Sequence, residues 1–122
     1  MRHNESTLQC QCVRWFRYEY PRFTIFAIPN GGNRDAITGA IMKKEGVLAG
    51  VADLFLMVGT DNYHGLFIEM KTKEGKQADS QKLFQFQCEA NGYKYVVCRT
   101  FEEFTLTIRQ YLGEINYESS QI

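Results

Sequence analysis

Two short apolar segments joined by a turn-forming loop constrain the fold of this chain more than any other feature. Residues 50–59 are GVADLFLMVG, residues 66–71 are LFIEMK, and the loop between them is TDNYHG, which is rich in turn residues. The continuous apolar run over 54–58 is typical of a strand that is covered on both faces. The pattern therefore predicts a β-hairpin over residues 50–71, inside a sheet.

Charged residues interrupt this hairpin where an interior strand normally has none. Glu69 and Lys71 are two residues apart in the second strand, so their side chains point to the same face. Pairing of the two strands brings Asp53 beside Glu69. Burying such charges is costly unless they are paired or used. They can form a salt bridge at the end of a strand, or they can bind a metal ion.

Asp53 favours the metal-site interpretation, because it adds a second carboxylate to the pair. Two carboxylates and the main-chain carbonyl of Met70 supply oxygen ligands, which suit Mg²⁺ or Mn²⁺. A cation held there can bind a phosphate oxygen and acidify an attacking water molecule. Lys71 can orient that water and stabilise negative charge in the transition state. The pattern thus predicts metal-assisted hydrolysis of a phosphodiester bond.

The remaining segments predict an α/β fold around this hairpin. Apolar periodicity and capping signals indicate helices over 5–20, 36–45 and 80–91, and a last helix that begins after Thr100 with Glu103 at its capping-box position. Further strands are expected over 22–28 and 93–98. The order α-β-α-β-β-α-β-α predicts a mixed central β-sheet with helices packed on both faces.

Composition limits the class of protein. The chain has 122 residues, and 44% of them are hydrophobic, which predicts one soluble globular domain over 1–122. No apolar run approaches the roughly 20 residues of a membrane span, and no secretory signal is evident. We therefore expect an intracellular, cytoplasmic protein that is not associated with a membrane. The spacing of the four cysteines favours free thiols over disulfides or a zinc site.

Charge is balanced overall but not along the chain. Lys and Arg total 14, as do Asp and Glu, so the formal net charge is zero. The first 100 residues nevertheless carry 13 basic and 10 acidic side chains. This excess is compatible with a local phosphate-binding face.

The motifs together resemble a known nuclease family. Asp53-Leu54 followed by Ile68-Glu69-Met70-Lys71 is similar to the signature of the PD-(D/E)XK nuclease superfamily. The segments PNGGNR, GAIMKKEGVLAGVADLFLM, GLFIEMKTKEGKQADSQ and YKYVVC resemble the VRR-NUC (virus-type replication-repair nuclease) family over roughly residues 5–112. One departure is Ala52, which stands where relatives often have proline before the aspartate.

The resemblance implies a restriction-endonuclease-like core and specific roles for four residues. Asp53 and Glu69 are the expected metal-binding acids, Lys71 the catalytic lysine, and Gln81 a helix residue that faces the active site. Glu5 matches an acid that many relatives place in the first helix, where it completes the metal site. An equally economical interpretation is a solvated acid that complements the helix dipole.

Basic residues and a glycine-rich turn are candidates for DNA contacts. The turn Asn30-Gly31-Gly32-Asn33 can bring main-chain N–H groups close to phosphate, or can simply separate a strand from a helix. The basic candidates flank that turn and follow the catalytic strand: Arg34, Lys43, Lys44, Lys73, Lys76 and Lys82. For each lysine alone, ordinary solvation is the alternative.

The function implied by the resemblance is that of a metal-dependent endonuclease that selects DNA by its shape. Small stand-alone relatives resemble Holliday-junction resolvases that act as homodimers, and a two-fold dimer matches the two symmetric cleavage points of a four-way junction. Aromatic residues of the first helix exceed what one face would bury, so some are candidates for the dimer surface: Trp15, Phe16, Tyr18 and Tyr20. The alternatives are a nuclease of the same chemistry for flaps, other branches or duplex DNA, and a non-catalytic DNA-binding module with the same fold.

Overall fold

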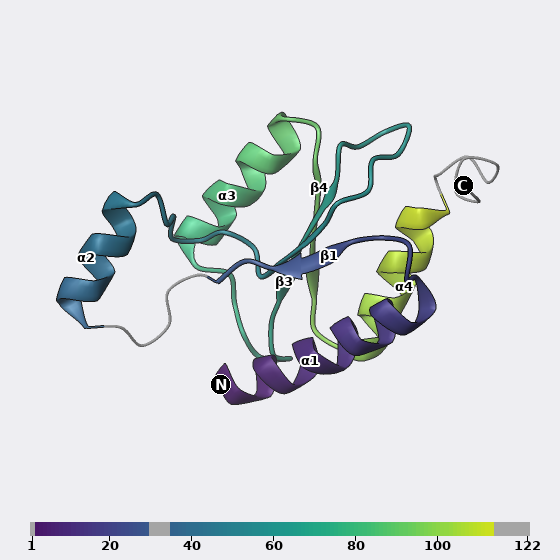
Figure 1. Cartoon of the computed structure of the whole chain (residues 1–122), viewed down its shortest axis with the longest axis horizontal. Coiled ribbons are helices and arrows are strands. Elements are labelled where there is room, and N and C mark those ends of the chain that lie inside the picture. Colours follow the sequence, from purple (N-terminus) through teal and green to yellow (C-terminus); the bar gives the residue numbers. More distant parts are fainter. Residues whose placement is uncertain (1, 30–34, 114–122) are drawn as a thin grey trace.

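The computed structural model describes residues 2–29 and 35–113, and within these ranges it confirms the predicted α/β architecture and element order (Figure 1). The elements are α1 (Arg2–Glu19), β1 (Ile25–Ala27), α2 (Ala36–Lys44), β2 (Leu54–Leu56), β3 (Leu66–Met70), α3 (Asp79–Ala90), β4 (Lys94–Cys98) and α4 (Phe101–Leu112). The first helix begins three residues earlier than predicted, and the strands are shorter than their apolar segments.

The sheet is mixed and has the order β1-β2-β3-β4. β1 and β2 pair antiparallel, as do β2 and β3, whereas β3 and β4 run parallel and are joined through α3. The predicted hairpin is therefore confirmed as β2 and β3. β2 ends early because the chain turns out of the sheet there, where the Val58 N–H donates to the Leu56 carbonyl at 3.0 Å.

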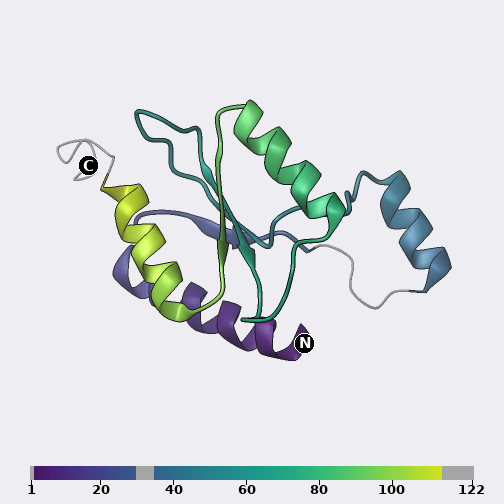
Figure 2. The same ribbon diagram turned by 180° about the vertical axis from the view of Figure 1, so that it is seen from behind.

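The larger core lies between the sheet and the pair α1 and α4, which pack side by side (Figure 2). Alternate strand residues point into it, and Phe16, Phe104 and Ile108 fill it from the helices. Trp15 makes edge-to-face ring contacts with Tyr20 and with two aromatic residues of α4. The four aromatics considered for a dimer surface are three residues of α1 and Tyr20, which directly follows it, and among them Tyr18 alone is largely exposed, at 83%.

A smaller core lies on the opposite side of the sheet, under α3. Its buried members are Ala52, Cys88 and Tyr95, with Phe67 and Phe84 packed against them. Because side chains alternate along a strand, the same strands supply both cores. The helices thus cover both faces of the sheet, as predicted.

Capping bonds explain where two of the helices begin. The Asp35 carboxylate accepts from the Thr38 N–H at 2.7 Å and starts α2, and the Thr100 hydroxyl accepts from the Glu103 N–H at 3.0 Å and starts α4. The Glu103 side chain also binds the main chain at this helix start, but one residue further back than in a standard capping box. Glu103 accepts from the Arg99 N–H at 2.7 Å, one residue before the cap.

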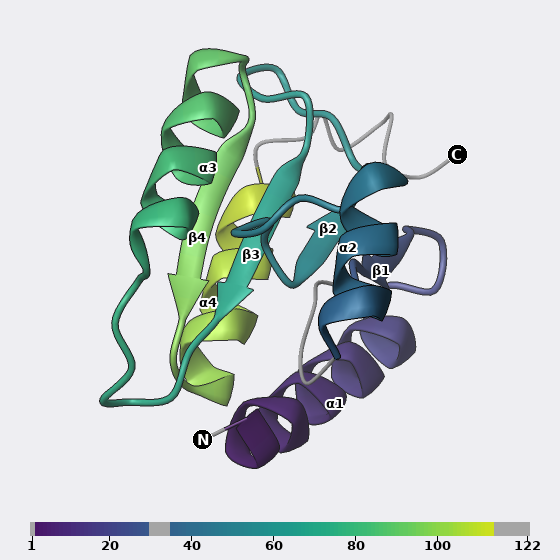
Figure 3. The ribbon, with the colours of Figure 1, turned by 90° about the vertical axis from the view of Figure 1, so that its left-hand side faces the viewer.

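Helix α2 stands apart from the rest of the fold, on the same side of the sheet as α3 (Figure 3). It buries none of its residues, and Ile37 and Ile41 are exposed. In the described parts of the chain, no helix is both long and apolar enough to cross a membrane.

Candidate active site

The hairpin brings Asp53 and Glu69 together. The pairs Leu54↔Ile68 and Phe55↔Phe67 set the register, so Asp53 lies opposite Glu69 at the next position. The Asp53 carboxylate accepts a hydrogen bond from the Met70 N–H at 2.7 Å, and its main-chain carbonyl accepts from the Ile28 N–H at 2.8 Å. Asp53 is therefore held by both neighbouring strands.

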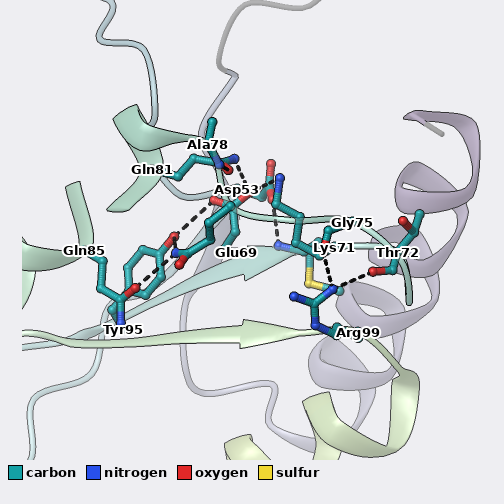
Figure 4. A network of polar contacts seen from close by, with 12 residues as sticks. Asp53, Glu69, Lys71, Thr72, Gly75, Ala78, Gln81, Gln85, Tyr95 and Arg99 are labelled. Atoms are coloured by element: carbon teal, nitrogen blue, oxygen red, sulfur yellow. Dashed lines mark hydrogen bonds and ion pairs between the residues drawn. The ribbon is translucent and has the colours of Figure 1, made fainter. Parts of the chain in front are cut away.

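Glu69 is buried, with 3% of its side chain exposed, and partners surround its carboxylate (Figure 4). Gln81 Nε2 donates to Oε2 at 2.7 Å, and the Tyr95 hydroxyl donates to Oε1 at 3.4 Å. Lys71 Nζ lies 3.9 Å from Oε2 and is 13% exposed. The structure thus brings together all four residues that the sequence predicts for catalysis: Asp53, Glu69, Lys71 and Gln81.

The electrostatics of this site indicate a deficit of positive charge. Burial and the neighbouring Asp53 carboxylate raise the pKa of Glu69 to about 8, although Lys71 lowers it. A cation between the two acids would remove that penalty, so the residues present fit a divalent metal ion. In the described ranges, no three His, Cys, Asp or Glu side chains lie close enough to share a metal. Two carboxylates completed by main-chain, water and phosphate oxygens are an ordinary donor set for Mg²⁺.

Helix α3 holds the Glu69 carboxylate through its first turn. Gln81 accepts from the Ala78 N–H at 2.8 Å with its amide oxygen, which leaves the amide nitrogen for Glu69. The segment before Asp53 passes close to this turn at Gly50, which has a φ of 89° and no room for a Cβ against the Ser80 main chain. The close approach at Gly50 places Asp53 and Gln81 around the same carboxylate.

A second set of polar residues at the site escaped the sequence interpretation. Gln77 Nε2 donates to the Tyr95 hydroxyl at 3.2 Å and to Gln85 Oε1 at 3.0 Å. Gln85 thus fixes the Gln77 amide, and Gln77 in turn positions the hydroxyl that donates to Glu69. Tyr95 sits in an apolar segment and carries no sequence signal of its own. Only the parallel pairing of β3 and β4, with Phe67 opposite Tyr95, places it there.

Arg99 organises the loop that follows Lys71. Its Nη1 donates to the carbonyls of Thr72 at 2.9 Å and Gly75 at 2.5 Å, and it reaches the Lys73 carbonyl at 3.5 Å (Figure 4). The loop therefore has a defined course next to the acids. Arg99 was not among the predicted site residues. Its partners are main-chain carbonyls, which every residue has, so no sequence pattern indicates the contact.

The other predicted site residues have varied positions. Glu5 lines a cavity of about 550 Å³ with Ala27 and further α1 residues, and it does not form a three-acid cluster with Asp53 and Glu69. Its role as a metal ligand stays a prediction, as does that of the Met70 carbonyl. Five predicted DNA-binding lysines are exposed: Lys43 and Lys44 in α2, Lys73 and Lys76 in the loop, and Lys82 in α3. Asn30, Gly31, Gly32 and Arg34 lie outside the described residues.

The fold and site have the PD-(D/E)XK pattern: an acid directly before β2, an acid in its hairpin partner β3, and a lysine directly after β3. The VRR-NUC domain profile matches residues 1–102, so the chain belongs to the VRR-NUC family. No curated protein sequence matches it. A solved structure described as a VRR_NUC domain protein is similar in fold, with a TM-score of 0.77 and 24% identity, over 92% of this chain and 90% of the other.

Proposed function

We propose that this nuclease is a divalent-metal-dependent endodeoxyribonuclease that cuts branched DNA as a Holliday-junction resolvase. The observation that carries the proposal is the buried Glu69 carboxylate beside Asp53, with Lys71 Nζ only 3.9 Å away. Two adjacent acids in a buried position are unfavourable for stability. Membership of a nuclease family supports a catalytic reason for their presence.

Each residue of the site has a distinct part in the proposed reaction. Asp53 and Glu69 would hold Mg²⁺ or Mn²⁺, and Gln81 orients Glu69 through its 2.7 Å hydrogen bond. When bound, the ion supplies a Lewis acid that binds the phosphate and makes water a better nucleophile. The Lys71 ammonium orients that water and stabilises the negative charge that develops on the phosphate.

The exposed lysines support DNA as the substrate. Lys73 and Lys76 are exposed on the loop that follows Lys71 and that Arg99 holds, so DNA bound at the acids would pass close to this loop. Contacts from lysine to phosphate position a duplex without reading its sequence. This arrangement fits selection by DNA shape.

A homodimer is part of the proposal because a four-way junction has two equivalent cleavage points. One chain supplies one pair of acids, and a two-fold axis would supply the second. Light scattering with and without junction DNA tests this part, and a monomer under both conditions would contradict it.

The decisive experiment compares a labelled four-way junction with a matched linear duplex, each incubated with Mg²⁺ or Mn²⁺. Paired symmetric cuts in the junction alone, absent in Glu69→Ala, are the expected result. Cleavage of both substrates would keep the nuclease and discard the resolvase. Tight junction binding without cleavage in either metal would instead indicate a non-catalytic DNA-binding module.

A further inference from the structure

A row of aromatic side chains crosses all four strands of the sheet in register. Phe26 pairs with Phe55, Phe55 with Phe67, and Phe67 with Tyr95. The ring centroids of Phe26 and Phe55 are 5.7 Å apart, and those of Phe55 and Phe67 are 4.6 Å apart. The row lies on the side of the sheet that α3 partly covers, and the rings of Phe26, Phe55 and Phe67 contact one another in turn.

The cover over this row decreases from one end to the other. Phe84 of α3 contacts the rings of Phe67 and Tyr95, and Tyr95 is buried. Phe55 is half-buried, and Phe26, on the edge strand β1, is 40% exposed. Among the described residues, Phe55 supplies the ring contact made by Phe26. An aromatic side chain is thus left accessible at the uncovered end.

This accessible end lies on the same side of the sheet as the two acids. Asp53 comes two residues before Phe55, and Glu69 comes two residues after Phe67, so alternation places all four side chains on one face. A two-residue step along a strand is about 7 Å. The covered end of the row reaches the site as well, because the Tyr95 hydroxyl donates to Glu69. A DNA strand cut at the acids would bring a neighbouring nucleotide to the aromatic row.

The helices around this face carry exposed cations as well as exposed carboxylates such as Asp79 and Glu89, a mixture that fits a polar ligand better than an apolar partner. Helices α2 and α3 both lie on this side of the sheet (Figure 3), and they carry the exposed cations Lys43, Lys44 and Lys82. Phosphate groups attract such cations, whereas bases stack on aromatic rings without regard to sequence. Exposed lysines on the helices around this face, and an exposed phenylalanine on the sheet, offer partners for both halves of a nucleotide.

We propose that Phe26, backed by Phe55, is a stacking site for an unpaired nucleobase next to the cut phosphate. The inference rests on the proposed function and deepens it. In a linear duplex each base is already paired and stacked inside the helix, whereas a base at a branch point can be displaced onto a protein ring. Stacking at Phe26 therefore favours DNA with a branch or an unpaired nucleotide beside the cut.

The test measures base stacking directly, in Lys71→Ala protein so that the DNA stays intact. The probes are a four-way junction with one 2-aminopurine at the branch point and a linear duplex with 2-aminopurine in the same local sequence. Phe26→Leu is the matched variant, because it keeps an apolar side chain but removes the π face. Phe26→Trp keeps the π face. Sedimentation and Mn²⁺ binding are measured for each variant.

If a base stacks on Phe26, the Lys71→Ala protein with its native Phe26 should change the fluorescence of the junction probe and not that of the duplex probe. Phe26→Leu is then expected to lose this change and to bind the junction about tenfold more weakly. Phe26→Trp should retain both properties, and Mn²⁺ affinity and duplex affinity should stay constant.

Three results would overturn the inference. One is a Phe26→Leu variant that binds and quenches like the parent, since that indicates packing alone. Another is an equal loss of affinity for junction and duplex. The third is a change of oligomeric state in Phe26→Leu, which would assign this face to contact between copies. If the unmodified protein, with native Phe26 and Lys71, neither binds nor cuts any DNA, the proposed function itself fails.

Discussion

The two faces of the sheet come from the same strands, but one of them combines apolar packing with buried and half-buried charged groups. Toward α1 and α4, the strands present buried apolar side chains such as Leu54, Ile68 and Met70. Toward α3, the intervening residues include Asp53 and Glu69 together with the aromatic row. Strand alternation lets one segment stabilise the fold with one face and carry the chemistry with the other.

The polar face is stable only because its groups have partners. Glu69 has Gln81, Tyr95 and Lys71, and Asp53 has the Met70 N–H. In the part of the chain that the structure describes, every buried side-chain nitrogen and oxygen has a hydrogen-bond partner. The difference between the faces predicts which substitutions affect activity and which affect folding.

Loss of Lys71 should have the largest effect and should separate the faces most clearly. Lys71→Ala removes the ammonium that stabilises transition-state charge, so we expect kcat to fall by a factor of about 10²–10³. Because Lys71 Nζ is 3.9 Å from Glu69, and because Gln81 and Tyr95 still bind that carboxylate, we expect a smaller loss of unfolding free energy than from a buried apolar cavity. Nuclease assays and urea denaturation on the same protein check both parts, with Lys73→Ala as the control. Equal losses in the two lysine variants would contradict a special role for Lys71.

A cavity on the face toward α1 and α4 should lower stability and leave the metal site intact. Leu54 is fully buried, and Leu54→Ala is expected to lower the free energy of unfolding by about 2–5 kcal/mol. At temperatures where the variant is folded, Mn²⁺ affinity should be close to that of the parent. Urea midpoints and calorimetry measure the two quantities. A large loss of metal affinity without loss of stability would show that the faces are not independent.

The pKa of Glu69 predicts how stability depends on pH without metal. Its folded value of about 8 lies above the reference value of 4.5, so the folded state binds this proton more tightly. The associated stability is fully present below pH 4.5 and is lost as pH rises through about 8. Thermal unfolding in chelator should therefore give a falling Tm over this window, and Glu69→Gln should flatten the slope.

Metal binding should show the reverse pH dependence, because the ion competes with that proton. Mn²⁺ affinity is expected to rise up to about pH 8 and then level off. A pH-independent affinity would contradict the assignment of Glu69 as a ligand.

Tyr95→Phe should weaken metal binding moderately. The substitution keeps the ring that packs on Phe84 and removes the hydroxyl that donates to Glu69. Partners of metal-binding carboxylates affect metal affinity by about 10- to 100-fold, and the long 3.4 Å contact places Tyr95 at the lower end. Calorimetric titration with Mn²⁺ measures this. An unchanged affinity would make Tyr95 a packing residue only.

Changes in α2 should have the smallest effect on folding. Ile37→Ser and Ile41→Ser alter exposed side chains of a helix that buries none of its residues, so we expect a change in unfolding free energy within about 0.5 kcal/mol. Urea denaturation at two protein concentrations checks this. A larger loss that depends on concentration would show that α2 packs on a second copy.

Much of the fold was predictable because local patterns and tertiary packing agree. The hairpin, the Asp35 and Thr100 helix starts, and the element order follow from apolar periodicity and capping residues. Strand lengths were overestimated, because apolar residues continue beyond the last ladder hydrogen bond. β2, for example, ends at Leu56 although the apolar run continues to Val58.

The candidate site divides in the same way. The sequence by itself determined that Asp53, Glu69 and Lys71 meet, because hairpin pairing and strand alternation are local rules. The tertiary structure decided which groups surround them. Gln77 lies just before α3, Tyr95 is in the parallel strand β4, and Arg99 follows β4 and binds main-chain carbonyls of the loop after Lys71. Contacts between segments far apart in the chain depend on packing, and no periodicity within a segment records them.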